Sequence, residues 1–186
     1  MAAGWSRIAR RIRVPLGFVF AAFFLWLAHP SAAFLALSLL LVIPGLWLRG
    51  HASGYVKKNA EITMTGPYAY TRNPLYLGST LIAFGFALAA RSVWIALALA
   101  VLFAVIYIPV IHAEEAFLRA NFAGYDEYAS RVPRLLPRLS PKVMAVGEAG
   151  AFSSALYRKH REYNALIGSA AIYAALIFKL CFWHSR

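Results

Sequence analysis

Apolar residues gather in five runs along the chain, each 15 to 21 residues long. The runs cover residues 14–28, 32–48, 75–90, 92–112 and 165–183. A helix needs about 20 apolar residues to cross the hydrocarbon core of a bilayer, and the run at 32–48 lacks the polar face of a helix on a soluble protein. The pattern predicts an all-α integral membrane protein with five transmembrane helices, forming a single domain over residues 1–186.

The basic residues, which outnumber the acidic ones 19 to 7, indicate which way the helices run. Four lie before the first run, four between the second and third runs, and eight between the fourth and fifth runs. With five crossings these three segments face one side, so 16 of the 19 cations share a face. Short basic segments stay on the cytoplasmic side of a membrane. We therefore predict a multi-pass protein of the inner membrane with a cytoplasmic N-terminus and an external C-terminus.

The composition supports this interpretation and narrows the alternatives. Hydrophobic residues make up 61% of the chain, charged residues 14%, and the mean hydropathy is +0.62, whereas a soluble domain is about a quarter charged. The Arg-rich start, the first apolar run and the small residues 31–33 also match a cleaved signal peptide, which we consider a weaker alternative. Topology accounts for the positive charge, so no nucleic-acid partner is expected. The single cysteine, Cys181, excludes an internal disulfide and a CxxC zinc site.

The third and fourth runs are separated only by a turn around Arg91, so they predict a tight antiparallel hairpin. Such a hairpin brings the start of one helix and the end of the other together at the cytoplasmic face. In the loop after the fourth run, RVPRLLPRLSPK (131–142) contains three prolines, which prevent a continuous helix. There we expect a strap along the lipid headgroups, followed by a short interfacial helix within 151–163.

A polar cluster occupies the start of the third helix. Gly66-Pro67 predicts a turn, and Asn73-Pro74 is typical of an N-cap followed by proline at the first helical position. The free N–H groups and the positive dipole end of such a helix bind anionic groups such as a carboxylate.

A second cluster, His112-Ala113-Glu114-Glu115, directly follows the apolar run of the fourth helix. Two carboxylates at membrane level are costly and need a positive partner. Arg72 is one candidate and a cationic ligand is another. The alternative is a pair of solvated acids on a helix that continues toward Arg119. A ligand with a carboxylate and extra positive charge, such as S-adenosylmethionine, fits both clusters together.

The ordered combination of these segments resembles the superfamily of membrane methyltransferases that includes isoprenylcysteine carboxyl methyltransferases and phospholipid N-methyltransferases. The similar stretch is the core at residues 61–137. It contains TGPYAYTRNPLYLG (65–78), then EEAFL (114–118) after one helical hairpin, and then YDEY (125–128) with RVP (131–133).

The resemblance implies an S-adenosyl-L-methionine-dependent methyltransferase with its cofactor pocket on the cytoplasmic side. The residues that it implies for cofactor binding are Glu61, Ile62, Thr63, Tyr68, Arg72, Asn73, Pro74, Leu75, Tyr76, Gly78 and Glu114. A carboxylate acceptor needs no base, whereas an amine or thiol must lose a proton, for which His112 and Glu115 are the candidates. No metal is expected.

The resemblance also implies a lipid-like or small hydrophobic methyl acceptor, methylated in the manner of the isoprenylcysteine enzymes. Two positions depart from that group. Asn73 replaces its usual histidine, as in phospholipid methyltransferases, and Val110 replaces a substrate-binding arginine of the eukaryotic enzymes. N-methylation of a phospholipid amine therefore stays open, as does a membrane protein that keeps the scaffold without catalysis. The sequence leaves the oligomeric state open.

Overall fold

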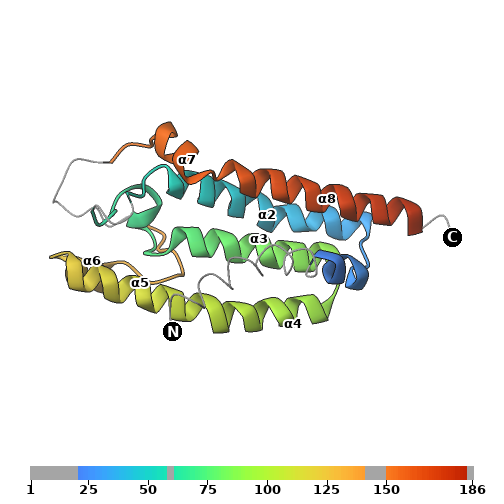
Figure 1. Ribbon diagram of the computed structural model, residues 1–186, viewed down its shortest axis with the longest axis horizontal. Coiled ribbons are helices and arrows are strands. Elements are labelled where there is room, and N and C mark those ends of the chain that lie inside the picture. The colour runs from blue at the N-terminus through green and yellow to red at the C-terminus, as the bar shows by residue number, and fades with distance from the viewer. Residues whose placement is uncertain (1–20, 58–60, 141–149, 184–186) are drawn as a thin grey trace, which may run out of the picture.

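A computed structural model describes residues 21–57, 61–140 and 150–183, and within these ranges the chain forms helices and turns without any strand (Figure 1). Residues 21–27 are helical. The elements that follow are α2 (Ala32–Ser53), the 3₁₀ turn η1 (Gly66–Ala69), α3 (Pro74–Ala90), α4 (Val93–Leu102), the π-helical turn η2 (Phe103–Tyr107), α5 (Ile108–Asn121), α6 (Tyr125–Arg131), α7 (Ser154–His160) and α8 (Tyr163–Trp183).

The apolar runs fall on helices wherever the structure describes them. Three helices are long and apolar enough to cross a bilayer, namely α2, the unbroken helix Val93–Asn121, and Tyr163–Phe182 of α8. The helix α3 is equally apolar but shorter, with 17 residues. Part of the first run, residues 14–20, lies outside the described residues. The count of five crossings and the orientation in the membrane stay predictions.

The fourth run differs from expectation because its helix does not end with the apolar residues. It continues through η2 and α5 to Asn121, nine residues beyond the predicted end. The wide turn η2 directly precedes Pro109, whose ring would clash with the carbonyl four residues earlier in a regular helix. A π-helical turn relieves this clash, so the helix passes the proline without breaking.

The predicted hairpin at Arg91 is confirmed. Arg91 ends α3 in the left-handed conformation, with φ 51°, and its guanidinium lies 5.0 Å from the centre of the Phe34 ring. The next residue, Ser92, caps α4, because its hydroxyl accepts a hydrogen bond from the Ile95 N–H at 3.4 Å. The chain thus reverses within two residues, and α4 returns alongside α3 (Figure 1).

The tightest packing joins α2 and α3. A Cβ atom added at Gly45 would lie 2.8 Å from the Gly78 carbonyl oxygen, and one at Gly78 would lie 2.8 Å from that of Gly45. Small residues of this kind let helix backbones approach closely in membranes. The helix α8 is tied to α2 through the hydroxyls of Ser38 and Tyr173, which are 2.6 Å apart.

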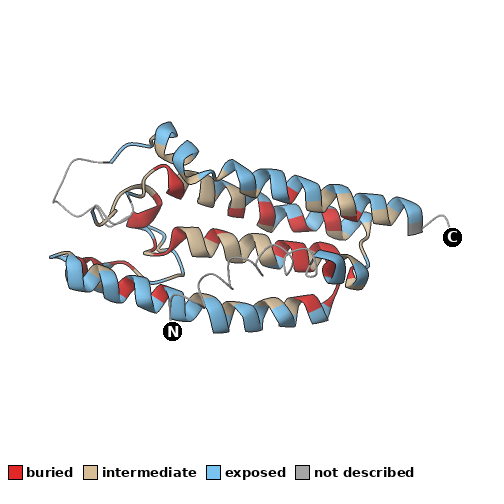
Figure 2. Ribbon diagram, viewed as in Figure 1, coloured by how far each residue is buried: buried red, intermediate tan, exposed pale blue. Residues whose placement is uncertain are grey.

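Burial is concentrated between α2 and α3, whereas the outer faces of α4 and α8 are exposed (Figure 2). The exposed side chains of α4 are large and apolar, and they include Val93, Trp94, Leu97 and Val101. An exposed apolar surface of this extent is expected where a helix contacts lipid.

The close approach of the two glycines gives a test of the fold. Gly78→Ala places a methyl group against a backbone carbonyl, and we expect a loss of about 1–3 kcal/mol in unfolding free energy. Gly168→Ala in α8 meets nothing within 4 Å, and alanine is the better helix former. Thermal unfolding in detergent is expected to show a lower midpoint for the first variant and an equal or higher one for the second. Equal midpoints for Gly78→Ala and the unmodified protein would contradict this packing.

Candidate active site

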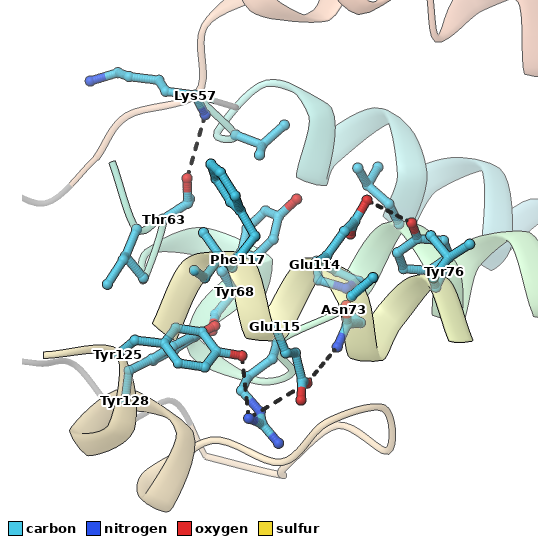
Figure 3. A pocket seen from close by; sticks show the side chains of 18 of the residues that line it. Lys57, Thr63, Tyr68, Asn73, Tyr76, Glu114, Glu115, Phe117, Tyr125 and Tyr128 are labelled. Carbon is cyan, nitrogen blue, oxygen red and sulfur yellow. Dashed lines mark hydrogen bonds and ion pairs between the residues drawn. The ribbon is translucent and has the colours of Figure 1, made fainter. Parts of the chain in front are cut away.

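A cavity of about 660 Å³ lies at the end of the bundle where α3 begins and α5 approaches its end (Figure 3). Ten of the eleven predicted cofactor-binding residues line it. They are Glu61, Ile62, Thr63, Tyr68, Arg72, Asn73, Pro74, Leu75, Tyr76 and Glu114. The hairpin therefore brings together two segments that lie about forty residues apart in the sequence.

Two predicted residues do not line the cavity. Gly78 lies in the contact between α2 and α3. His112 is exposed on α5, with its Nε2 atom 3.4 Å from Nη1 of Arg134. Sequence reasoning also missed several lining residues, among them Arg49, Ser79, Tyr107, Tyr128 and Glu162.

Glu115 is the buried charge that joins the elements around the cavity. Its carboxylate accepts hydrogen bonds from Arg134 at 2.9 and 3.1 Å and from the Asn73 amide at 3.4 Å. Arg72, the cation proposed from the sequence, lies 3.5 Å away. Only 5% of the Glu115 side chain is exposed, so the paired arginines stabilise a carboxylate that would be costly to bury alone.

Arg134 belongs to the proline-rich strap, which forms no continuous helix, as predicted: Arg131 ends α6, and residues 132–140 are non-helical. The strap contacts protein as well as solvent, because its backbone binds the segment before α3. The Arg72 N–H donates to the Pro133 carbonyl at 2.9 Å, and the Arg138 N–H donates to that of Tyr70 at 3.0 Å. Its location at the headgroups stays a prediction, and residues 141–142 lie outside the described residues.

Glu114 has a different environment from its neighbour. Its carboxylate accepts a hydrogen bond from the Tyr76 hydroxyl at 2.9 Å, and the ring of Tyr107 packs edge-on against Tyr76, with 5.3 Å between centroids. The sequence left open whether the helix ends at the two acids or continues toward Arg119. The helix continues to Asn121, so both carboxylates lie within it.

The acidic residues of the cavity differ in their pairing. Glu61 pairs with Lys57 at 3.0 Å, Glu162 pairs with Arg49 at 2.8 Å, and Glu115 pairs with its two arginines. Among the described residues, no cation lies within ion-pair distance of Glu114. Four carboxylates and three cations line the cavity, which makes it locally acidic in a chain of net charge +12.

Tyrosines form much of the remaining wall. Burial, then the carboxylates of Glu114 and Glu162, raise the pKa of Tyr68 well above its usual value, so its phenol stays protonated. Burial likewise raises the pKa of Tyr128, whose hydroxyl donates to the Tyr68 carbonyl at 2.8 Å. These contacts connect α6 to η1 behind the cavity.

Two groups along the wall retain capacity to bind an anion. The Nε atom of Arg72 is buried without a hydrogen-bond partner. Asn73 is the N-cap of α3 and Pro74 is its first residue, as predicted, but the Asn73 side chain does not cap the helix. It donates instead to Glu115 and to the Arg134 carbonyl, at 3.4 and 3.0 Å. The first turn of α3 therefore lacks a side-chain cap beside the cavity.

These features define a helical membrane protein with a polar cavity at one end of its bundle. Residues 31–124, about half of the chain, match the phospholipid methyltransferase family. The protein belongs to this family, within the superfamily of membrane methyltransferases that also contains the isoprenylcysteine enzymes. The resemblance found in the sequence is thereby confirmed.

Two curated relatives match part of the chain. The nickel-cobalt-cadmium resistance protein NccN of Alcaligenes xylosoxydans xylosoxydans is 38% identical over 114 residues, 59% of this chain and 53% of the relative. The cobalt-zinc-cadmium resistance protein CzcN of Cupriavidus metallidurans is 37% identical over 101 residues, 54% of this chain and 46% of the relative. The chain thus spans about half the length of these relatives. No solved structure matches it.

The buried carboxylate gives a test of the site. Glu115→Gln leaves Arg72 and Arg134 without their shared anion, and breaking a buried pair costs about 3–5 kcal/mol. We expect a clear fall in the unfolding midpoint in detergent. The matched control is Glu127→Gln, which removes an exposed carboxylate paired with Arg131 and is expected to cost less than about 1 kcal/mol. Similar effects of the two substitutions would contradict the anchoring role of Glu115.

Proposed function

We propose that the protein is an S-adenosyl-L-methionine-dependent methyltransferase that acts on a lipid-like or small hydrophobic acceptor. The observation that carries this proposal is Glu114, a carboxylate that lines the cavity and has no cationic partner among the described residues. A cationic ligand supplies that partner. Family membership supports methyl transfer as the reaction.

The residues present fit this cofactor. A cavity of about 660 Å³ is within the range of small-molecule sites. Glu114 would hold a positive group of the cofactor, while the Arg72 Nε and the uncapped first turn of α3 would hold its carboxylate. Arg134 pairs with Glu115 beside the cavity and balances the four carboxylates and three cations of the lining, so the fit to a cationic cofactor rests on the unpaired Glu114 and not on the net charge of the wall.

When bound, the cofactor would supply a methyl carbon that an in-line nucleophile attacks, with S-adenosylhomocysteine as the leaving group. The protein's task is to align the two reactants and to exclude water. The aromatic rings of Tyr68, Tyr76 and Tyr107 provide the apolar wall, and the Tyr76 hydroxyl holds the carboxylate of Glu114 in place.

The contacts of the two candidate bases, His112 and Glu115, favour a carboxylate acceptor, as in the isoprenylcysteine enzymes. Glu115 is held by two arginines, and His112 is directed to Arg134 away from the cavity. Neither is arranged to remove a proton from an acceptor in the cavity. A carboxylate needs no such step, and its charge would cancel with the sulfonium in the transition state.

N-methylation of a phospholipid amine is the second candidate. It is favoured by the family match over residues 31–124 and by Asn73. The two reactions differ in product, since a carboxylate yields a base-labile ester and an amine yields a stable methylamine.

The names of the two relatives concern resistance to nickel, cobalt, zinc and cadmium. In the described ranges, no three His, Cys, Asp or Glu side chains come together as a metal site. We propose that methyl transfer is what this chain would contribute in such a setting.

Cofactor binding to purified protein in detergent tests the proposal. Glu114→Gln is expected to weaken S-adenosylmethionine binding at least about tenfold, because it removes the anion opposite the cofactor's positive charge. Asp126→Asn removes an exposed carboxylate away from the cavity and is expected to leave the affinity unchanged. Absence of binding by the unmodified protein, with lipid restored, would favour a scaffold without catalysis.

The acceptor class is tested with a labelled methyl donor. Membranes containing the protein are expected to form a labelled lipid-soluble methyl ester. Mild base is expected to hydrolyse this ester and release the label as methanol. A product stable to base would instead assign amine methylation. Membranes containing Glu114→Gln serve as the control and are expected to form little of either.

A further inference from the structure

The C-terminal helix contributes to the cavity although it lies outside the family match at residues 31–124. Glu162, just before α8, lines the cavity together with Arg49 of α2 and Ser79 of α3. Three helices therefore meet at this part of the wall. None of these three residues belongs to the sequence motifs that identified the family.

Arg49 and Glu162 form a bidentate ion pair. Nε of Arg49 donates to Oε2 of Glu162 at 3.0 Å, and Nη2 donates to both carboxylate oxygens at 2.9 and 2.8 Å. Nη1 donates to the Ser79 hydroxyl and, at 3.5 Å, to the Leu75 carbonyl. Each guanidinium nitrogen thus has an acceptor, and the pair is fixed in the wall rather than free to move.

A partly buried ion pair is a poor source of stability, because desolvation of both charges offsets most of their attraction. The side chains of Arg49 and Glu162 are 25% and 11% exposed, so solvent screens this ion pair little. The Glu162 carboxylate also affects the electrostatics of the cavity wall, since Glu162, like Glu114, raises the pKa of the Tyr68 phenol. Glu162 therefore contributes to the same electric field as the carboxylate proposed to hold the cofactor.

We propose that Glu162 is a positioning residue that neutralises Arg49 and so makes the cavity prefer the cationic methyl donor over its neutral-sulfur product. This inference rests on the proposed function and extends it to a residue that directly precedes the C-terminal helix α8. Without Glu162, Arg49 is an uncompensated cation in the wall, and it repels a ligand that carries a sulfonium. The product S-adenosylhomocysteine lacks that charge and is repelled less.

The test measures the dissociation constants of S-adenosylmethionine and S-adenosylhomocysteine on the full chain in detergent. Glu162→Gln is expected to weaken donor binding about tenfold and product binding no more than about twofold. The double variant Arg49→Met with Glu162→Gln removes both charges, and it is expected to return the ratio of the two constants to within about twofold of the unmodified protein. Glu127→Gln, with an equal charge change at an exposed pair, is expected to leave the ratio unchanged.

The outcomes separate this inference from the proposed function. An unchanged ratio in Glu162→Gln, or equal loss of both ligands, would show a structural role and overturn the inference while the proposed function stands. Failure of the double variant to restore the ratio would also overturn it, because the effect would not depend on the charge of Arg49. Binding of neither ligand by the unmodified protein would overturn both.

Discussion

The arrangement of the site depends on one buried carboxylate, Glu115. It lies on the continuous helix that follows the Arg91 turn, and it binds Arg72 and Asn73 at the start of α3 and Arg134 in the strap. A carboxylate buried to this degree must be paired, so its three partners are held around one point. The same interaction fixes the Arg134 side chain of the strap, whose backbone is held separately by hydrogen bonds to Tyr70, Thr71 and Arg72. The two acids of the Glu pair thus have separate roles, since Glu115 organises the wall and Glu114 is left for a ligand.

Charge is distributed very unevenly between the chain and its cavity. The chain as a whole carries +12, yet four carboxylates and three cations line the cavity. Charges at membrane level are costly and are retained where they bind or transport something. The excess of positive charge therefore lies outside the cavity, where the acids other than Glu114 are neutralised pair by pair. This arrangement suits the cationic ligand that we propose.

The apolar framework determines where this polar region is placed. The glycine contact between Gly45 and Gly78 brings the α2 and α3 backbones together, which sets Arg49 beside the first turns of α3. The helix α8 packs on α2 through Ser38 and Tyr173 and brings Glu162 to the same point. Segments inside and outside the family match therefore build one cavity, and the position of each charge follows from helix packing.

The sequence by itself determined the helical membrane class, the family, the hairpin at Arg91 and about half of the cavity lining. Apolar run length and turn chemistry are local signals, so they can be read along the chain. It left open whether the fourth helix ends at the Glu pair or continues toward Arg119, and the structure shows that it continues to Asn121. Nor did it reveal that Arg134 and Glu162 enter the site. Ion pairs between residues 19 and 113 positions apart leave no periodic pattern in a sequence, and only the tertiary structure selects which of many charges meet.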